Sequence, residues 1–324
     1  MPSKLTNKLF SLIVRLKYPD VAPELRYFYR DTFSCELVQG KYLLRDYVIK
    51  SKYKDLDFSG EFGQELLFVL PFAYWHYKNG TLRSTKSAKY TKELYFFSPD
   101  HKEIYDIRTT EGNYNFEMPR ILYSQDYQMS KWLPVPLKAQ YQNDIYIYEK
   151  PLLIIANRYN MEWDGPPVSF IDIPSLDFMI SKLKQNYTIV YNRPRPENIT
   201  NDNSDTYDLN EFDWLQREHP EVILMENLFK ENKAKARNFN HLQLMIYANA
   251  NHFISVHGGT ATLASYFGGL NLIVSKKGPE HFFNCFHDLF PQLSGARILV
   301  AQRDEEIKQH VADHFVMNWG DKLR

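Results

Sequence analysis

The chain has few cysteines, no excess of charge of either sign and no long apolar run. Its 324 residues include only two cysteines, Cys35 and Cys285, which lie far apart, so we expect neither a disulfide framework nor a cysteine metal cluster. Lys plus Arg and Asp plus Glu number 39 each, which leaves no global basic field to hold a nucleic-acid backbone. We therefore expect no nucleic-acid partner.

The N-terminus combines basic residues with a short apolar run over 9–14. The run is far shorter than the ~20 residues of a membrane span, and no small-residue cleavage site follows it. Together with the low cysteine content, this predicts a cytoplasmic protein. Two interpretations of the segment stay open: an ordinary first helix that packs on the protein, or a helix in peripheral contact with a membrane surface.

Several common catalytic motifs are absent. The sequence contains no G-x-x-x-x-G-K-[ST], no G-x-G-x-x-G and no G-x-S-x-G, which argues against a P-loop ATPase, a dinucleotide oxidoreductase and an α/β-hydrolase. The histidines form no H-E-x-x-H cluster; His310 and His314 share a helix face without a suitable acidic partner, and the Asp55-Leu56-Asp57 triplet stands at the entrance of a strand. We expect no obligatory metal and no cofactor.

The second half of the chain alternates between apolar runs of strand length and helical patterns. Such alternation predicts βαβ units, and hence a parallel sheet covered on both faces. The predicted strands are Leu152–Ala156, Thr188–Tyr191, Val222–Met225, Phe253–Val256 and Leu272–Val274. The predicted helices are Ile173–Lys184, Asn210–Arg217, Asn240–Ala250, Thr260–Phe267 and Arg303–Met317, with a polar surface loop over Asn198–Asp208.

The first half has a less regular pattern. A strand around Leu56–Phe58 leads through Gly60-Glu61-Phe62-Gly63 into an apolar helix over Gln64–Tyr77, and a second strand is predicted at Leu94–Phe97. The fold class is therefore α/β with two Rossmann-like domains. We place the first domain at 1–148 and the second at 149–302, with a C-terminal helix over 303–324 that could cross back to the first domain.

The most informative segment is Ile254–Phe267, in which an apolar strand breaks at two glycines and restarts as a helix. The glycines let the backbone approach a ligand closely, so the N–H groups of Thr260, Ala261 and Thr262 could point at an anion. This favours a diphosphate site after His257. The alternative is an ordinary strand-to-helix turn, since such turns often contain glycine.

Other polar residues also follow the predicted strands, at the edge where parallel sheets bind ligands. Arg158 and Arg193 could clamp a pyrophosphate, because guanidinium groups bind phosphate oxygens in pairs. Glu226 follows the third strand. Each arginine could instead lie in a solvent-facing loop, and His257 could be a structural histidine bonded to a carbonyl group.

Group transfer to a hydroxyl also needs a base to accept the proton. Glu61, which follows the first strand of the first half, is the first candidate. Asp100 and His101, which follow the predicted strand at Leu94–Phe97, are the second. Each could equally be a helix cap or a surface residue.

These features resemble the glycosyltransferases of the GT-B architecture, two Rossmann-like domains that face a central cleft. The segment Asn240–Thr260, with Gln243 and the turn His257-Gly258-Gly259-Thr260, looks like the Gln-containing helix, strand and His-Gly-Ala-Gly turn of the family of plant xylosyltransferases and lumenal protein O-linked N-acetylglucosaminyltransferase. Arg193 and Glu226 fall in similar places. Gly60–Leu67 looks like the first loop of fucosyltransferase-type GT-B enzymes.

The resemblance implies a glycosyltransferase that moves a sugar from a nucleotide-diphosphate donor to a glycan or glycolipid acceptor. The second domain would bind the donor through its turn residues, and the first would bind the acceptor, with inverting, metal-independent catalysis. Three alternatives stay open: an epimerase or a phosphorylase on the same scaffold, and a non-catalytic nucleotide- or sugar-binding module.

Overall fold

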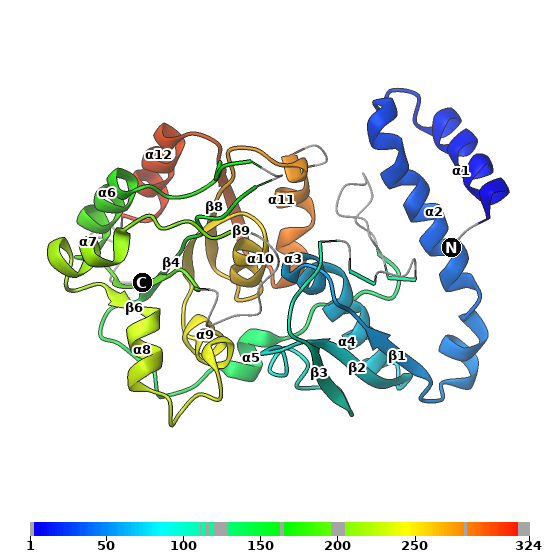
Figure 1. Cartoon of the computed structure of the whole chain (residues 1–324), viewed down its shortest axis with the longest axis horizontal. Coiled ribbons are helices and arrows are strands. Elements are labelled where there is room, and N and C mark those ends of the chain that lie inside the picture. Colours follow the sequence, from blue (N-terminus) through cyan, green and yellow to red (C-terminus); the bar gives the residue numbers. More distant parts are fainter. Residues whose placement is uncertain are drawn as a thin grey trace. The chain divides into compact units, whose positions relative to one another are not determined.

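The computed structural model describes residues 3–110, 112–113, 117–118, 129–162, 165–195, 205–281 and 284–316. The chain divides into two compact units, Met1–Val135 with Pro279–Leu289, and Pro136–Gly278 with Phe290–Arg324. Each unit contains a sheet of parallel strands with helices around it (Figure 1). The predicted α/β class with parallel sheets is therefore confirmed.

The first unit begins with a helical hairpin. Helix α1 (Lys4–Lys17) starts at Ser3, whose hydroxyl accepts a hydrogen bond from the Thr6 N–H and so caps the helix. A short 3-10 turn, η1 (Pro23–Leu25), leads into α2 (Arg26–Gly40), and the π-helical segment η2 (Leu44–Ile49) follows. Helix α1 packs on α2, with the rings of Phe10 and Phe33 at 5.8 Å.

The sheet of the first unit has the order β1-β2-β3, with β1 at Lys54–Asp57, β2 at Leu82–Ala88 and β3 at His101–Tyr105. Between β1 and β2 the chain is helical from Phe62 to Lys78, as α3 (Phe62–Gln64), η3 (Glu65–Val69) and α4 (Leu70–Lys78). The helix predicted over Gln64–Tyr77 is confirmed. Residues 66–73 are all buried, which explains the strength of the sequence signal.

The strand predicted at Leu94–Phe97 is wrong. These residues form hydrogen-bonded turns, in which Leu94 donates to the Thr91 carbonyl and Ser98 to the Tyr95 carbonyl. Leu94, Tyr95 and Phe97 are nevertheless buried, and a short apolar run does not distinguish a strand from any other buried segment. As a consequence, Asp100 and His101 lie at the start of β3 and not beyond the end of a strand.

The second unit contains a six-stranded parallel sheet with the order β6-β5-β4-β7-β8-β9. Its strands are β4 (Leu152–Ala156), β5 (Thr188–Asn192), β6 (Ile223–Leu224), β7 (His252–Val256), β8 (Leu270–Val274) and β9 (Arg297–Ala301). The first five were predicted, and β9 was missed. When the strands of this unit are numbered from 1 to 6 along the chain, their order in the sheet is 3-2-1-4-5-6, which is typical of nucleotide-binding sheets. Successive strands are added on one side of β4 up to β6 and then on its other side, starting with β7.

Helices cover both faces of this sheet. Inward residues of α6 (Ile173–Leu183), α7 (Glu211–Glu218) and α12 (Asp304–His314) share one core with Leu153, Ile155 and Ile254. On the other face, α9 (Phe239–Ala248) and α10 (Gly259–Ser265) bring Tyr247 and Phe267 against Phe253. Strands that are buried on both faces have nearly continuous apolar sequences, which is why the periodicity located them.

The remaining elements are short. Helix α5 (Leu137–Tyr141) packs on α9, and α8 (Met225–Glu231) packs on β5, β6 and α9. The turns η4 (Pro279–His281) and η5 (Phe290–Leu293) flank α11 (Cys285–Asp288). Among the described residues, none of the helices combines the length and apolar character that a membrane crossing requires.

The predicted domain limits stay predictions. Residues 136–148 group with the second unit and 279–289 with the first. Helix α12 packs on α6 and β9 within the second unit. Residues 317–324, and 198–204 of the predicted polar loop, lie outside the described residues.

Candidate functional site

The candidate site lies at the carboxyl ends of β4 and β7, where the strand order of the second sheet reverses. These two strands are neighbours, with Ala156 opposite Ser255. The residues that follow them, Arg158 and His257, are therefore brought to the same edge. This is the position at which open parallel sheets bind nucleotides, because the connections after the two neighbouring strands lead to opposite faces of the sheet and leave a crevice between them.

Asn157 fixes the backbone at the end of β4. Its side-chain amide donates to the Ile171 carbonyl at 2.9 Å and to the Tyr191 hydroxyl at 3.1 Å. Its side-chain oxygen accepts the N–H groups of Arg158 and Ile171. Because the fully buried Asn157 satisfies its own polar atoms in this way, the start of the next loop is held in one conformation.

His257 is held between Ser275 and Glu162. Its Nδ1 atom lies 2.9 Å from the Ser275 hydroxyl, and its Nε2 atom lies 3.4 Å from a Glu162 carboxylate oxygen. Burial raises the pKa of Glu162, but its hydrogen bond with His257, the charges of His257 and Arg158 and the Ser169 N–H outweigh this effect, so the pKa lies below its usual value. Glu162 is therefore a buried carboxylate anion in the site.

Arg158 lies between Glu162 and the turn that follows His257. Its Nη2 atom is 3.7 Å from Glu162 Oε1, and Nη1 donates to the His257 carbonyl at 3.4 Å. Its Nε atom has no hydrogen-bond partner. Nε is buried, but 22% of the side chain is exposed. The guanidinium group is thus held by long contacts only, and its exposed part retains donor capacity for an anionic ligand.

Gly258 permits the close approach of this arginine. It has φ +84° and ψ −151°, a conformation that is nearly restricted to glycine. A β-carbon at this position would lie 2.8 Å from Nη1 of Arg158. The backbone conformation therefore requires a glycine here, and a side chain at this position would also displace the end of the Arg158 side chain.

The turn has fewer free backbone N–H groups for a ligand than the sequence predicted. The Thr262 N–H donates to the Gly258 carbonyl at 3.0 Å, so the expectation that it is free is wrong. Ala261 is fully buried, whereas Gly259 and Thr260 are partly exposed. The first-turn N–H groups of a helix have no partner within it, so a ligand at this corner would meet Gly259 and Thr260.

Two other residues predicted to bind the nucleotide, Arg193 and Gln243, contact other protein groups. Arg193 is 6% exposed and forms a bidentate ion pair with Glu211, and it also donates to the Tyr207 carbonyl. The Gln243 side-chain oxygen accepts from the Asn192 amide at 2.7 Å. These contacts favour structural roles, and a role in donor binding stays a prediction.

Glu226 lies in the first turn of α8. Its carboxylate pairs with Arg195 at 3.2 Å and with Lys230 at 2.9 Å. The carboxylate is mostly buried, with 18% of the side chain exposed. Its role in donor binding likewise stays a prediction.

The predicted bases belong to the first unit and lie at opposite ends of its strands. Glu61 follows β1 and precedes the first turn of α3. Asp100 is exposed and lies 3.5 Å from Lys102. His101 begins β3, with Nδ1 at 2.8 Å from the Thr85 hydroxyl, its ring stacked on Tyr95, and no partner at Nε2. Because burial lowers the pKa of His101, its imidazole is neutral at neutral pH.

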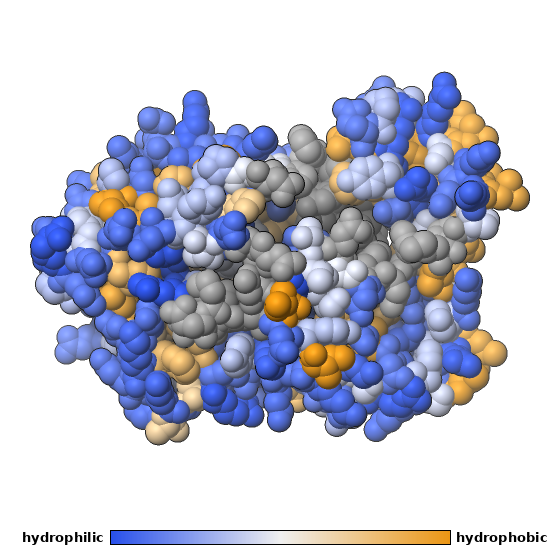
Figure 2. All heavy atoms as spheres, viewed as in Figure 1, coloured by the Kyte–Doolittle hydropathy of each residue, from blue (hydrophilic) through white to orange (hydrophobic). Residues whose placement is uncertain are grey.

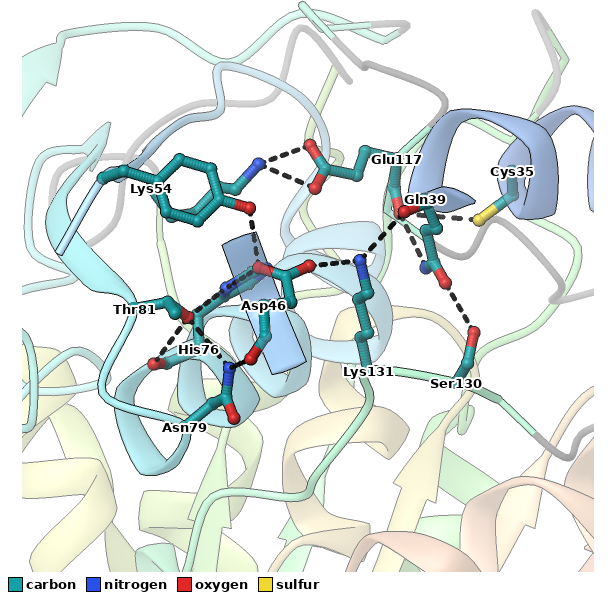
Figure 3. A network of polar contacts seen from close by, with 11 residues as sticks. Cys35, Gln39, Asp46, Lys54, His76, Asn79, Thr81, Glu117, Ser130 and Lys131 are labelled. Atoms are coloured by element: carbon teal, nitrogen blue, oxygen red, sulfur yellow. Dashed lines mark hydrogen bonds and ion pairs between the residues drawn. The ribbon is translucent and has the colours of Figure 1, made fainter. Parts of the chain in front are cut away.

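A second cluster of polar residues lies inside the first unit (Figure 3). The Lys54 ammonium contacts both oxygens of Glu117 at 2.6 Å, and Lys131 pairs with Asp46. Asp46 also accepts the Tyr53 hydroxyl at 2.6 Å. All four charged side chains are buried. The two lysine ammonium groups neutralise the two carboxylates.

Asp46, Glu117 and His76 could together offer ligand atoms to a metal ion, since these atoms lie within 4.8 Å of one another. Both carboxylates are already bound by lysine ammonium groups, which supply the positive charge that a metal would bring. Burial lowers the pKa of His76 to about 2, and the charges of Lys54 and Lys131 add to this effect. We assign this cluster to structure rather than to metal binding.

A hollow of about 570 Å³ lies at the other edge of the second sheet. Residues before and at the start of β4 and β5 line it, among them Lys150, Lys184, Tyr187 and Glu221. Lys184 and Glu221 form an ion pair across 2.9 Å. Parallel sheets bind ligands at the carboxyl ends of their strands. We therefore do not assign nucleotide binding to this hollow.

Sequence reasoning missed Glu162 and Ser275. Ser275 directly follows β8, so the strand-end rule that selected Arg158 and His257 would have found it had β8 been treated in the same way. Glu162 comes later in the loop after β4, where its backbone N–H and carbonyl bond to those of Gly165. No periodicity in the sequence marks such a position.

Comparison with known proteins identifies no family. No family model matches the chain, and no curated protein sequence matches it. Among solved structures, the chain is similar to the catalytic domain of starch synthase IV from Arabidopsis thaliana bound to ADP and acarbose, at 13% identity and a TM-score of 0.32, with 93% of this chain and 72% of that chain covered. At this TM-score the likeness carries no argument, and the α/β assignment rests on the two parallel sheets themselves.

Proposed function

We propose that the chain is a nucleotide-sugar-dependent glycosyltransferase of the GT-B type, whose second unit binds the diphosphate of the donor. The observation that carries this proposal is the convergence of Arg158, His257 and Gly258 at the point where the strand order reverses. A partly exposed guanidinium group that is held only by long contacts, next to a partly exposed turn, suits an anion better than a neutral ligand.

The proposed chemistry follows from where charge develops. The acceptor oxygen forms a bond to the anomeric carbon while the bond from that carbon to the diphosphate breaks, and the diphosphate leaves with the electron pair. Arg158 and the N–H groups of Gly259 and Thr260 would stabilise the charge on the departing group. Glu162 would hold His257 and Arg158 in place from the buried side.

The acceptor and its base are proposed to belong to the first unit. Glu61 is the first candidate for the base, and Asp100 and His101 are the second. The Asp100 carboxylate is exposed, whereas the neutral His101 imidazole would have to expose its buried Nε2 atom to accept a proton. The acceptor would be a glycan or glycolipid hydroxyl, with inversion at the anomeric carbon and no metal or cofactor. A cytoplasmic location with peripheral membrane contact belongs to the same proposal.

The donor site is tested by measuring thermal unfolding in the presence of a panel of nucleotides and nucleotide sugars. A ligand that binds only the folded protein raises the unfolding temperature by mass action. We expect stabilisation by a nucleoside diphosphate and its sugar conjugate, and none by the nucleoside alone. Equal stabilisation by the nucleoside would contradict a diphosphate site.

Turnover separates the transferase from the alternatives. Hydrolysis or transfer that releases a nucleoside diphosphate supports the transferase, conversion of the sugar with the nucleotide still attached supports an epimerase, and binding without turnover supports a non-catalytic module. The variants Glu61→Gln, Asp100→Asn and His101→Gln should each retain nucleotide binding. If none of the three lowers turnover, our assignment of the base is wrong.

A further inference from the structure

Two segments of the first unit expose large apolar side chains next to basic ones. The first is α1, whose exposed leucines are Leu5, Leu9, Leu12 and Leu16. Their spacings of four, three and four residues place them on one face of the helix. Leu5 is 78% and Leu16 is 74% exposed, so this face is turned away from α2.

The buried face of α1 is a different one. Val14 is fully buried, and Phe10 contacts Phe33 of α2. The packing of α1 on α2 therefore accounts for one apolar stripe, and the leucine stripe stays exposed among the residues that the structure describes. Figure 2 shows hydrophobic spheres gathered at the upper right, where α1 lies.

Basic residues run beside the leucine stripe. Lys4, Lys8 and Arg15 each precede one of the leucines by one position, so they lie along one flank of the stripe. The helix contains no acidic residue. The whole chain has equal numbers of acidic and basic residues, whereas α1 carries only basic ones. The helix therefore has a local positive charge that the chain as a whole lacks.

The second segment, residues 41–52, has the same character. Its exposed apolar residues are Leu43, Leu44, Tyr47, Val48 and Ile49. Its exposed basic residues are Lys41, Arg45, Lys50 and Lys52. Asp46 is the one acidic residue in this stretch, and it is fully buried.

The inward contacts of Asp46 hold this second segment in place (Figure 3). Its carboxylate binds Lys131 and Tyr53, and its backbone carbonyl accepts the Asn79 amide at 2.7 Å. The buried side of η2 is thus tied to the rest of the unit. Its apolar and basic side chains are presented outward by a fixed backbone.

We propose that α1 and residues 41–52 form a docking surface for a lipid bilayer that contains anionic headgroups. Exposed leucines beside lysines and arginines are the features that let a helix lie at a bilayer interface, where the apolar side enters the acyl boundary and the basic side meets the headgroups. A second copy of the chain fits less well, because cations would face cations. A nucleic acid would leave the leucines exposed.

The proposal is tested by flotation of the full chain with vesicles of phosphatidylcholine, with and without phosphatidylglycerol. We expect the protein to float with the anionic vesicles, less with phosphatidylcholine alone, and less at high salt, which screens the charges. Failure to float with anionic vesicles overturns the proposal. Neither nucleotide nor turnover is needed, so that failure would remove the proposed membrane contact and leave the proposed sugar transfer unaffected.

Matched variants locate the surface. The double variants Leu9→Gln/Leu12→Gln and Val48→Gln/Ile49→Gln should each lower the vesicle partition coefficient about tenfold, because exposed apolar side chains no longer enter the interface. The control Ile145→Gln/Ile147→Gln changes two exposed residues of the second unit and should bind as the wild type does. Circular dichroism and thermal unfolding verify that each variant is folded.

Charge reversal tests the basic flank in the same assay. Lys4→Glu/Lys8→Glu should lower binding to anionic vesicles by about tenfold or more, whereas Lys182→Glu/Lys233→Glu should not. If both double variants bind anionic vesicles equally well, the basic residues of α1 do not contribute to vesicle binding, and this part of the proposal is wrong. If sedimentation instead shows a dimer that the leucine variants dissociate, without vesicle binding by the wild type, the surface belongs to a second copy and the proposal is wrong.

Discussion

The Nη1 atom of Arg158 lies 2.8 Å from the position that a β-carbon on Gly258 would occupy. Gly258 also has φ +84°. The backbone conformation therefore requires a glycine, and any side chain at this position would also displace the end of the Arg158 side chain.

Gly258→Ala should lower both stability and nucleotide affinity. The strained backbone costs about 1–3 kcal/mol, and the new methyl group displaces the Arg158 guanidinium from the candidate site. Gly295→Ala is a matched control in the same unit, because Gly295 has φ +80° and nothing within 4 Å of an added β-carbon. Titration calorimetry should show weakened nucleotide binding for the first variant alone.

Arg158→Gln should weaken binding of a nucleoside diphosphate by roughly tenfold or more, since hydrogen bonds from a charged donor contribute about 1.5–3 kcal/mol each. Arg217→Gln removes an arginine whose side chain is 68% exposed and serves as the control. Calorimetry at constant salt measures both. Unchanged affinity in the Arg158 variant would remove the main support for the donor site.

Glu211→Ala should destabilise the second unit by about 3–5 kcal/mol, because the buried guanidinium group of Arg193 loses its partner. The double variant Arg193→Met/Glu211→Leu should recover much of this loss, since no unpaired charge remains. Chemical unfolding measures both free energies. A large loss of nucleotide affinity in a folded double variant would instead support the predicted role of Arg193 in donor binding.

His76 should make the protein less stable as the pH falls. The pKa of His76 is lowered by burial from 6.5 to about 2, so between these values the unfolded chain binds a proton that the folded chain does not. Stability is therefore fully present above pH 6.5 and falls below it, with a slope of up to about 1.4 kcal/mol per pH unit.

Urea unfolding of the wild type and of His76→Gln at pH 7 and pH 5 measures this effect. The variant should show a smaller loss between the two pH values, although its stability at pH 7 is lower because the contact with the Thr81 hydroxyl is lost. His287→Gln, at an exposed position, should behave as the wild type does. Identical pH dependence in His76→Gln would show that other groups dominate.

Local apolar patterns were sufficient to predict most strands of the second unit, but they were insufficient to predict those of the first unit. Strands such as β4 and β7 are apolar over their whole length because both faces are buried. Strand β2 has the sequence Leu-Arg-Ser-Thr-Lys-Ser-Ala and carries little apolar signal. Conversely, Leu94–Phe97 is apolar because it packs in the core, although it forms turns.

The sequence by itself determined the alternation of strands and helices in the second half, the breaking glycine at Gly258 and the residues that follow each strand. Only the tertiary structure decided which of these residues meet. Strand order brings Arg158 beside His257, and a loop turn brings Glu162 to both. Periodicity reports which face of an element is buried, whereas neighbours in a parallel sheet are far apart in the chain and depend on packing of the whole unit.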